Sequence, residues 1–464
     1  MTNEVKVLII GGGAAGLAAA VELERAGVSC QVLEAQARLG GRVHSVSLES
    51  GVSFERGAQI INGDMNAVLA LAKEADLHLS PVPAVGEDLC VVNGDVVSRD
   101  TLVSADEIET LLSDAIRSWS SPREATRSVM SLYRWWSSPW EDLDEAKRGV
   151  KMVAVRDTAP RGSLGAAIRQ LLLCPEDEAI ARTMMAEQYG ADPDAINALA
   201  VRRSLDSYGS ERRDLEFQIP AGMSKVISTL AAKLSPPPIL KTPVTDISNN
   251  SNCLVVTAGD QQWRADHVIV AVPPPIAQKI PISIANGDRL SGLLGAFAPG
   301  DMIKTTLTYD RPFWRAEGLS GAVTFAAPLG LEVLDTSYHA NDRYQLTAFL
   351  GGPEARRRAR LCKGEREDLL ISDVSKALGK ATSRPVQVNE AVWVDDRWSG
   401  GGYNAYIKNG HPHDAAQQLA QWPGPVRFAG AELDDTFAGY VEGALRSGRR
   451  VARDIATELA VISQ

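Results

Sequence analysis

The sequence predicts an α/β fold in which a domain built on a parallel sheet is combined with a second, α+β domain. One observation is the order of strand, glycine-rich turn, helix and strand at the N-terminus. Another is that buried-strand segments return far along the chain, at 266–272 and 426–428. A length of 464 residues, 45% of them hydrophobic, is also enough for two ordinary domains with well-buried cores.

The N-terminal segment indicates a Rossmann-like dinucleotide-binding unit. Val5–Ile10 reads VKVLII, a β-branched run suited to a strand buried on both faces, and it leads directly into Gly11–Gly16. A helix is expected over 17–27 and a second strand over 29–34, which ends at Glu34. Glu34 follows the last glycine by 18 residues, close to the spacing of about 20 in the dinucleotide-binding fingerprint.

Each residue of this motif has a physical role. Gly11 permits the tight turn, Gly13 lets the backbone approach a pyrophosphate, and Gly16 lets the helix pack closely on the strand. The N-terminus of the helix supplies unpaired N–H groups and a partial positive charge for the phosphates. Glu34 can accept both ribose hydroxyls, which disfavours a 2′-phosphate. The motif alone does not distinguish NAD from FAD.

The residues that follow Glu34 favour FAD. They read AQARLGGRVHS, in which a glycine doublet precedes Arg42. This resembles the doublet of the flavin-dependent amine oxidase superfamily (monoamine oxidase-like), which also includes L-amino-acid oxidases, polyamine oxidases and phytoene desaturases. Gln36 stands where that family usually has its first arginine, whereas Arg38 and Arg42 are retained. The resemblance implies that the doublet and Arg42 lie against the phosphates of FAD.

Two C-terminal segments strengthen the resemblance. Residues 426–450 read VRFAGAELDDTFAGYVEGALRSGRR and resemble the family segment FAG(x)E…GYxEGAxxSG, with a helix N-terminus aimed at the flavin. Residues 393–403 resemble the segment W(x4)[WY]SGGxY. Gly402 stands where monoamine oxidases carry the cysteine that bonds to FAD. We therefore expect non-covalent FAD.

The resemblance also assigns roles in catalysis. Tyr403 and Tyr440 match the two facing tyrosines that form a slot for the amine in front of the flavin. Lys304, in a strand followed by PFW, matches the lysine that reaches flavin N5 through a water. The alternative is that both tyrosines are ordinary core residues without a role in catalysis and that Lys304 is a surface lysine. Ile303 and Leu307 favour a partly buried strand around Lys304.

The remaining site residues follow from the same motifs. FERGAQIING, at 54–63, resembles the acidic-x-Gly-Ala segment beside the flavin, and Val244 matches the residue whose backbone holds the adenine. The residues expected to bind the cofactor are Gly11, Gly13, Ala15, Gly16, Glu34, Ala35, Arg38, Gly41, Arg42, Gly57, Ala58, Val244, Trp393, Gly430, Glu432, Gly439, Tyr440 and Val441. The residues expected to bind the substrate are Gln59, Ile60, Tyr403 and Tyr440.

The resemblance implies the amine oxidase fold, an interleaved Rossmann-like FAD-binding domain plus an α+β substrate-binding domain. The FAD-binding domain is expected at 1–80, 210–285 and 389–464, and the substrate domain at 81–209, which is mostly helical, and 286–388. The first segment of the substrate domain, 81–209, contains four tryptophans that are interpreted as part of the hydrophobic core of its helices: Trp119, Trp135, Trp136 and Trp140.

The expected reaction is oxidation of an amine by hydride transfer to flavin N5. The imine product hydrolyses to a carbonyl compound, and O2 reoxidises the flavin to give H2O2. An L-amino-acid oxidase stays open as a second interpretation, with its substrate carboxylate paired by one of Arg202, Arg203, Arg311 and Arg315. A carotenoid- or porphyrin-type desaturase, an NADPH-using monooxygenase and a flavin-bearing binding module also stay open. The sequence has no second GxGxxG after a strand, which disfavours the monooxygenase.

Composition limits the partners. The formal net charge is −10, which disfavours nucleic acid because phosphate binding needs a basic face. No run of 18 apolar residues predicts a membrane span, and the first residues lack the features of a signal peptide. Five scattered cysteines with no metal-binding spacing favour a reducing cytoplasm and no metal. The oligomeric state is left open, with a homodimer as one option.

Overall fold

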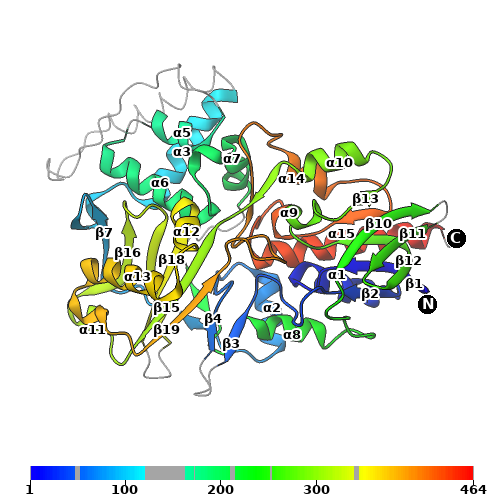
Figure 1. The fold of residues 1–464 in the computed structure, drawn as a ribbon, viewed down its shortest axis with the longest axis horizontal. Helices are drawn as coiled ribbons and strands as arrows, with labels where there is room; N and C mark the ends of the chain where they lie inside the picture. The colour runs from blue at the N-terminus through cyan, green and yellow to red at the C-terminus, as the bar shows by residue number, and fades with distance from the viewer. Residues whose placement is uncertain are drawn as a thin grey trace.

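A computed structural model describes most of the chain. The described residues are 2–47, 53–120, 162–171, 173–208, 215–250, 253–338 and 344–462. Two seven-stranded sheets lie at opposite ends of the molecule (Figure 1). The first sheet belongs to the nucleotide-binding part and the second to the part expected to hold the substrate.

The first sheet runs in the order β13-β10-β11-β12-β1-β2, with β21 pairing with β12. Strands β2, β1, β12 and β21 are parallel, whereas β10, β11 and β12 form an antiparallel meander. The strands are β1 (Thr2–Ile10), β2 (Cys30–Leu33), β10 (Val244–Asn250), β11 (Cys253–Ala258), β12 (Gln261–Val270), β13 (Ile282–Ser283) and β21 (Val426–Phe428).

Helices cover both faces of this sheet because β1 is apolar on both. Val7 and Ile9 pack into one cluster, and Leu8 and Ile10 pack into another. The helices on the first face are α1 (Ala14–Arg25), α2 (Asn66–Glu74), α8 (Ser224–Ala231) and α15 (Val441–Ile462). Those on the second face are α9 (Pro274–Ala277), α10 (Gly287–Leu294) and α14 (Ala415–Ala420).

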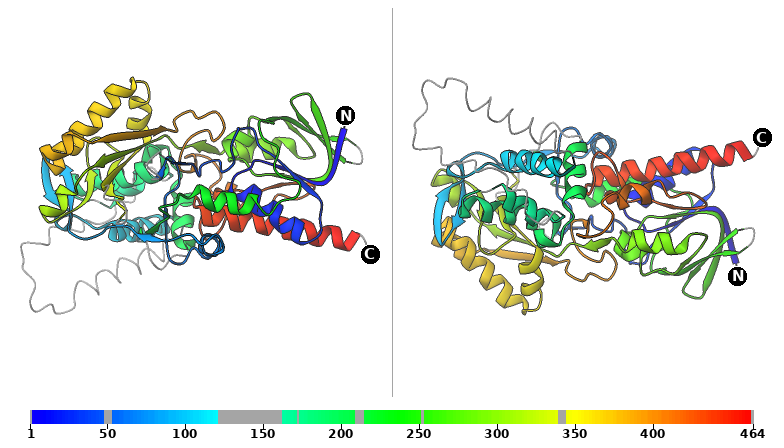
Figure 2. Two further views of the ribbon diagram at one scale, coloured as in Figure 1. Left: turned by 90° about the horizontal axis from the view of Figure 1, so that it is seen from below. Right: turned by 90° about the horizontal axis from the view of Figure 1, so that it is seen from above.

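Small residues let the first and last helices approach closely. Figure 2 shows α15 running alongside α1. A Cβ on Gly448 of α15 would lie 2.1 Å from the carbonyl oxygen of Ala15 in α1. A Cβ on Gly16 would lie 2.0 Å from the carbonyl oxygen of Gly11. The alanine- and glycine-rich start of α1 is therefore needed for packing as well as for ligand access.

The second sheet runs in the order β19-β15-β18-β17-β16-β7-β8. Its strands are β7 (Glu87–Val92), β8 (Asp95–Ser98), β15 (Met302–Tyr309), β16 (Leu319–Phe325), β17 (Leu331–Asp335), β18 (Tyr344–Gly351) and β19 (Gln387–Val392). One face packs on α13 (Lys363–Leu378), together with α11 (Phe313–Ala316). Side chains of the other face, among them Met302 and Phe349, point toward the first sheet's domain and line a cavity there.

Further helices pack in the second sheet's part of the molecule. They are α3 (Ala105–Ser120), α5 (Leu164–Gln170), α6 (Pro175–Tyr189), α7 (Ala198–Ser207) and α12 (Gly352–Arg358). Among them, α6 contributes Glu187 and Gln188 to the cavity wall. Short strands link the parts: β3 (Ser45–Ser47) with β4 (Ser53–Glu55), β5 (Ile60–Ile61) and β6 (Ser80–Pro81) with β9 (Phe217–Gln218), and β14 (Phe297–Pro299) with β20 (Ala405–Ile407).

The predicted elements of the nucleotide-binding unit are found with small shifts. The helix expected from 17 begins at Ala14, directly after the glycines. The strand expected at 266–272 is β12, which begins earlier, at Gln261. The expected substrate-domain segment 81–209 also contributes two strands, β7 and β8, to the second sheet. Strand β19 belongs to the same sheet and crosses the expected domain boundary at 389. The predicted Trp cluster lies outside the described residues, apart from the backbone of Trp119.

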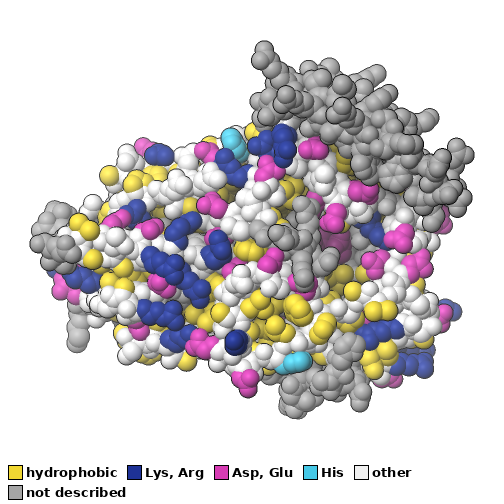
Figure 3. All heavy atoms as spheres, turned by 180° about the vertical axis from the view of Figure 1, so that it is seen from behind, with side chains coloured by type: hydrophobic (Ala, Val, Ile, Leu, Met, Phe, Trp, Pro, Cys, Tyr) yellow, Lys and Arg dark blue, Asp and Glu magenta, His cyan; other side chains and the backbone are white. Residues whose placement is uncertain are grey.

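The surface charge is unevenly distributed. Figure 3 shows Lys and Arg side chains gathered on the face opposite that of Figure 1, beside an area of hydrophobic side chains. The net charge of −10 therefore does not describe every face of the molecule. No helix within the described ranges is long and apolar enough to cross a bilayer.

Candidate active site

A cavity of about 640 Å³ lies between the two sheets and extends to the glycine-rich turn after β1. It brings together residues from the N-terminal, middle and C-terminal segments. The predicted site residues that line it are Gly11, Gly13, Ala15, Glu34, Ala35, Gly41, Arg42, Gly57, Ala58, Gln59, Ile60, Val244, Lys304, Trp393, Tyr403, Gly430, Gly439, Tyr440 and Val441. Three other predicted residues, Gly16, Arg38 and Glu432, lie just behind this surface and support it.

The glycine-rich end of the cavity has the shape of a phosphate cradle. A Cβ on Gly13 would have only the carbonyl oxygen of Gly40 nearby, at 4.0 Å, so the backbone of Gly13 faces open space. Gly13 is also the N-cap of α1 and has no side chain to cap it. The first N–H groups of α1 are therefore available to an anion in the cavity. These features fit the pyrophosphate of a dinucleotide.

Glu34 is held at the end of β2 with its carboxylate in the cavity wall. Its side chain is buried, its Oε2 accepts from the Gly12 N–H at 2.7 Å, and its Oε1 accepts from the Gln36 N–H at 2.7 Å. Each oxygen keeps further acceptor capacity. Glu34 can therefore accept hydroxyl groups of a ribose while its orientation is fixed by the backbone.

An ion pair between the partly buried Arg42 and the buried Glu432 joins two distant segments at the wall of the cavity. Arg42 Nη1 lies 2.6 Å from Glu432 Oε1, and Arg42 Nη2 lies 3.0 Å from Glu432 Oε2. Arg42 Nη1 also donates to the Tyr403 carbonyl at 2.6 Å, and Glu432 accepts from the Ala405 N–H at 3.0 Å. Burial would raise the pKa of Glu432, but the charge and hydrogen bonds of Arg42 outweigh it and lower that pKa. Sequence reasoning places Arg42 on phosphates and misses this pairing.

Arg38 stabilises the loop of the glycine doublet. Its guanidinium donates to the carbonyls of Leu39, Gly41 and Val43, at 3.2, 2.8 and 3.2 Å. The doublet itself has positive φ at Gly40 and Gly41, +106° and +57°, which favours glycine at both positions. Arg38 therefore fixes a backbone shape that only glycine tolerates well.

Lys304 is buried in the cavity wall on β15. Its Nζ donates to the Gly57 carbonyl at 2.8 Å and lies 5.3 Å from the centre of the Phe349 ring. The side chain is only 2% exposed, which contradicts the interpretation as a surface lysine. Burial lowers the pKa of Lys304 to about 7, although the nearby charge of Glu55 raises it.

Glu55 is the acidic residue of the FERGAQ segment, to which sequence analysis assigned no role. It is buried, accepts from Ser45 Oγ at 2.8 Å, and accepts from the Met223 N–H at 2.7 Å. Burial raises the pKa of Glu55, whereas Lys304 and these hydrogen bonds lower it. Glu55 and Lys304 thus form a buried pair of opposite charges beside the cavity.

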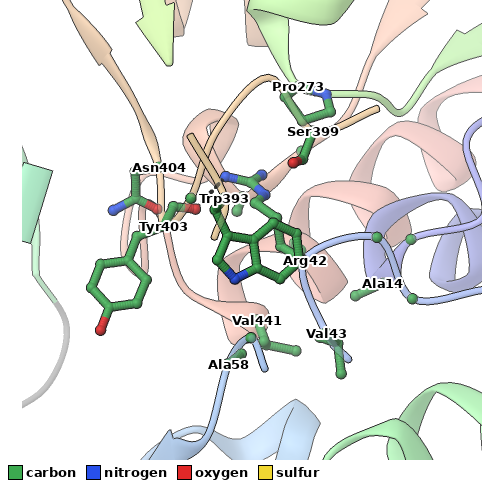
Figure 4. Close-up of a pocket in the computed structure, with 18 of the residues that line it drawn as sticks. Ala14, Arg42, Val43, Ala58, Pro273, Trp393, Ser399, Tyr403, Asn404 and Val441 are labelled. Carbon is green, nitrogen blue, oxygen red and sulfur yellow. Dashed lines mark hydrogen bonds between the residues drawn. The ribbon is translucent and has the colours of Figure 1, made fainter. Parts of the chain in front are cut away.

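The two predicted tyrosines both line the cavity, and each packs on a different aromatic ring. Tyr403 lies 6.2 Å from Phe349 between ring centres, and Tyr440 lies 5.3 Å from Tyr208. Figure 4 shows the Tyr403 ring projecting to one side of the cavity, away from Arg42 and Ala14. Burial raises the pKa of both phenols, which keeps them protonated at neutral pH.

Sequence reasoning missed several residues of this cavity. Glu187 of α6, Glu332 of β17 and Phe349 of β18 line it, and the ring of Tyr208 packs on that of Tyr440. They lie in the two expected segments of the substrate domain, 81–209 and 286–388, in which the sequence shows no recognisable motif. The arginines considered for a substrate carboxylate were Arg202, Arg203, Arg311 and Arg315. Among the described residues that line the cavity, none of these four is found.

A dinucleotide cradle that opens into an aromatic cavity with a buried lysine defines a flavoenzyme-like oxidoreductase. The comparisons identify which kind. The family model of flavin containing amine oxidoreductase matches residues 14–456. The chain therefore belongs to this family and is a flavin-dependent amine oxidase.

Individual relatives agree over nearly the whole chain. Amine oxidase [flavin-containing] B of Sus scrofa is 28% identical, covering 98% of this chain and 86% of that protein. An L-amino acid dehydrogenase of Synechocystis is 25% identical, covering 97% and 94%. A solved structure of putrescine oxidase bound to putrescine has a TM-score of 0.80 and 25% identity, covering 98% and 100%.

We predict that Glu432→Gln weakens both folding and flavin retention. The variant removes the negative charge and leaves Arg42 without its buried partner, a loss of about 3–5 kcal/mol for buried pairs. Urea unfolding and the flavin content of the purified protein measure both effects. The matched control is Asp266→Asn, which breaks the exposed pair with Lys6 and should cost about 0–1 kcal/mol. Wild-type stability and flavin content in Glu432→Gln would contradict the role of the ion pair.

Proposed function

We propose that this protein is an FAD-dependent amine oxidase that converts an amine to an imine, which water hydrolyses to a carbonyl product. The observation that carries the proposal is that the glycine cradle, the buried Lys304 and the two tyrosines all line one cavity. O2 is the proposed electron acceptor and H2O2 its product. The five cysteines form no disulfide, which supports action in a reducing cytoplasm.

The bound flavin supplies the two-electron oxidant that takes a hydride equivalent from the carbon next to the amine nitrogen. The chain's own residues bind and orient the amine. Tyr403 and Tyr440 form the walls of a slot with negative π-faces and exclude water from the reacting carbon. The buried, aromatic surroundings favour the neutral amine, so no protein base is required.

Lys304 acts after the amine has been oxidised. A buried cation stabilises negative charge that develops on oxygen, and little water is present here to screen it. The buried charge of Glu55 keeps part of the Lys304 population protonated near neutral pH. Lys304 is therefore proposed to assist the oxygen step rather than the amine step.

FAD is proposed to bind without a covalent bond. Gly402 stands at the position of the attaching cysteine, and a Cβ there would lie 2.8 Å from Trp393 Cβ and 3.1 Å from Met302 Cβ. A cysteine at Gly402 therefore has no free space in this arrangement.

We predict that acid denaturation releases all the yellow colour into the supernatant, with the mass and chromatographic behaviour of FAD. Colour that stays with the precipitated protein would contradict this.

We predict that Lys304→Met slows reoxidation of the reduced enzyme by O2 about 10²-fold or more, with little effect on anaerobic reduction. In the wild type, reoxidation should slow as pH rises through about 7, because the Lys304 cation is then lost. Glu55→Gln removes the charge that raises this pKa, so the midpoint should move to lower pH. Stopped-flow reoxidation over a pH series measures all three. The control is Lys6→Met at an exposed site, and equal rates in Lys304→Met and this control would contradict the role of Lys304.

The slot predicts different effects for two substitutions of each tyrosine. Tyr403→Phe and Tyr440→Phe keep the ring and should change anaerobic flavin reduction little. Tyr403→Ala and Tyr440→Ala remove a wall and should slow it about 10²-fold, because the amine is no longer aligned. FAD content should stay normal, since Gly13 and Glu34 lie at the other end of the cavity. If Phe is as damaging as Ala at both positions, the hydroxyls are chemically required and the slot model is wrong.

A further inference from the structure

Each of the two cavity tyrosines lies on a segment without regular secondary structure. Tyr403 precedes β20 by two residues, and Tyr440 directly precedes α15. Their rings pack on different neighbours, Phe349 of β18 and Tyr208 at the end of α7. Neither of these ring contacts sets the distance between the two tyrosines. A slot of constant width therefore requires a direct connection between their segments.

The side chain of Asn404 supplies such a connection. Asn404 directly follows Tyr403, and Gly439 directly precedes Tyr440. One end of the Asn404 amide faces the carbonyl oxygens of Gly439 and Tyr403, which can only accept hydrogen bonds. That end is therefore the NH2 group, which donates to Gly439 at 2.9 Å and to Tyr403 at 3.3 Å. One amide group thus holds both tyrosine segments.

Gly439 lies directly against this amide. A Cβ on Gly439 would lie 2.5 Å from the nearest atom of the Asn404 amide and 2.6 Å from its Cγ, which is too close for any side chain. Gly439 also has a φ of +90°, which favours glycine. Figure 4 shows the Asn404 amide on the same side of the cavity as the Tyr403 ring. The contact with Gly439 therefore places Asn404 on the backbone that leads into Tyr440.

The backbone hydrogen bonds of the two segments lead to other parts of the chain. The Asn404 carbonyl accepts from the Gly300 N–H at 3.0 Å, and the Gly439 N–H donates to the Ala431 carbonyl at 2.8 Å. Within the described ranges, no backbone hydrogen bond joins 403–404 to 439–440. In this part of the chain, the Asn404 side chain is therefore the direct hydrogen-bonded link between the two segments.

A second cavity lies behind this link. It has a volume of about 160 Å³, and Asn404 and Gly439 line it as well as the main cavity. Asn404 is thus half-buried, with a cavity on each side of it. An atom beside a cavity loses packing contacts on that side. The hydrogen bonds of Asn404 are therefore more important for its position than they would be in a packed core.

From this geometry we propose that Asn404 is a positioning residue, whose amide sets the separation of Tyr403 and Tyr440 and thereby the alignment of the amine between them. The inference rests on the proposed amine oxidation. Asn404 acts through the tyrosines, because its two donor hydrogens are directed at protein carbonyls. Loss of the link lets the two segments move apart, and a misplacement of about 1 Å in such a site can cost about 10²-fold in rate.

The test compares anaerobic flavin reduction in wild type, Asn404→Leu and Asn404→Asp, all as FAD-loaded enzyme. Leu has nearly the same size and no donor, and an ionised Asp has the same shape but presents only acceptors to the two carbonyls. The amine used is the one that reduces the wild type fastest among benzylamine, cyclohexylamine, n-butylamine and 1,4-diaminobutane. We expect the limiting rate at saturating amine to fall about 10-fold or more in both variants.

Two controls accompany these rates. Reoxidation of the reduced variants by O2 should stay at the wild-type rate, because Lys304 is held on β15 by its hydrogen bond to Gly57. Asn249→Leu makes the same chemical change at an exposed position of β10 and should leave both rates unchanged. A general loss of structure would slow both half-reactions and lower the FAD content and the thermal midpoint.

A double-mutant cycle separates positioning from a merely structural role. Tyr440→Ala already removes one wall of the slot, so adding Asn404→Leu should slow flavin reduction by less than about 2-fold further. If the two residues acted independently, the full effect of Asn404→Leu would instead be multiplied onto that of Tyr440→Ala.

The outcomes distinguish the inference from the proposed function. A wild-type limiting rate in Asn404→Leu and Asn404→Asp, effects that multiply in the cycle, or loss of FAD from both variants overturns the inference while the proposed function stands. If no amine of the series reduces the wild-type flavin, the proposed function fails and the inference fails with it.

Discussion

The ion pair between Arg42 and Glu432 is the interaction on which the rest of the site depends. It connects the loop after the N-terminal glycines with the start of the C-terminal segment, and its hydrogen bonds extend to the backbone of Tyr403 and Ala405. Three parts of the chain that are far apart in sequence are thereby held around one cavity. A surface ion pair could not do this, because solvent and salt would screen it.

The two ends of the cavity differ in chemistry because they are built from different domains of the interleaved chain. The first sheet's domain presents uncapped backbone N–H groups at the start of α1, which fit phosphates, and the second sheet supplies side chains in rows. One such row carries the buried cation of Lys304, the ring of Phe349 and the carboxylate of Glu332. Because a sheet fixes the spacing within a row, Lys304 and Glu332 are held at a constant separation.

The sequence predicted the nucleotide-binding half well because backbone geometry there depends on glycine. Gly13 and Gly16 act through the absence of a side chain, and that absence is readable in a sequence. Lys304, Tyr403 and Tyr440 were found because they lie in recognisable motifs, and all three line the cavity. Glu442 belongs to the C-terminal motif without a predicted role. Its carboxylate accepts hydrogen bonds from the N–H groups of Ala67 and Val68 at the start of α2, which gives it a structural function.

The substrate half was not predictable in the same way. Glu187 and Glu332 are single residues on a helix and a strand, and nothing in their neighbours distinguishes them from solvated acids. They lie in the wall of one cavity only because the register of β17 and the end of α6 bring them there. Glu55 likewise influences the cavity only through the effect of its charge on Lys304. Such long-range pairing is set by tertiary packing, on which a single sequence carries little information.

The central claim is that an organic amine is the electron donor of a bound flavin. It is tested most directly by mixing the purified protein anaerobically with a series of monoamines and diamines and following the yellow absorbance. We predict that at least one amine bleaches the flavin completely with formation of one carbonyl product per flavin, and that O2 then restores the colour with formation of H2O2. A flavin that no amine bleaches, but that NADPH does, would contradict the account.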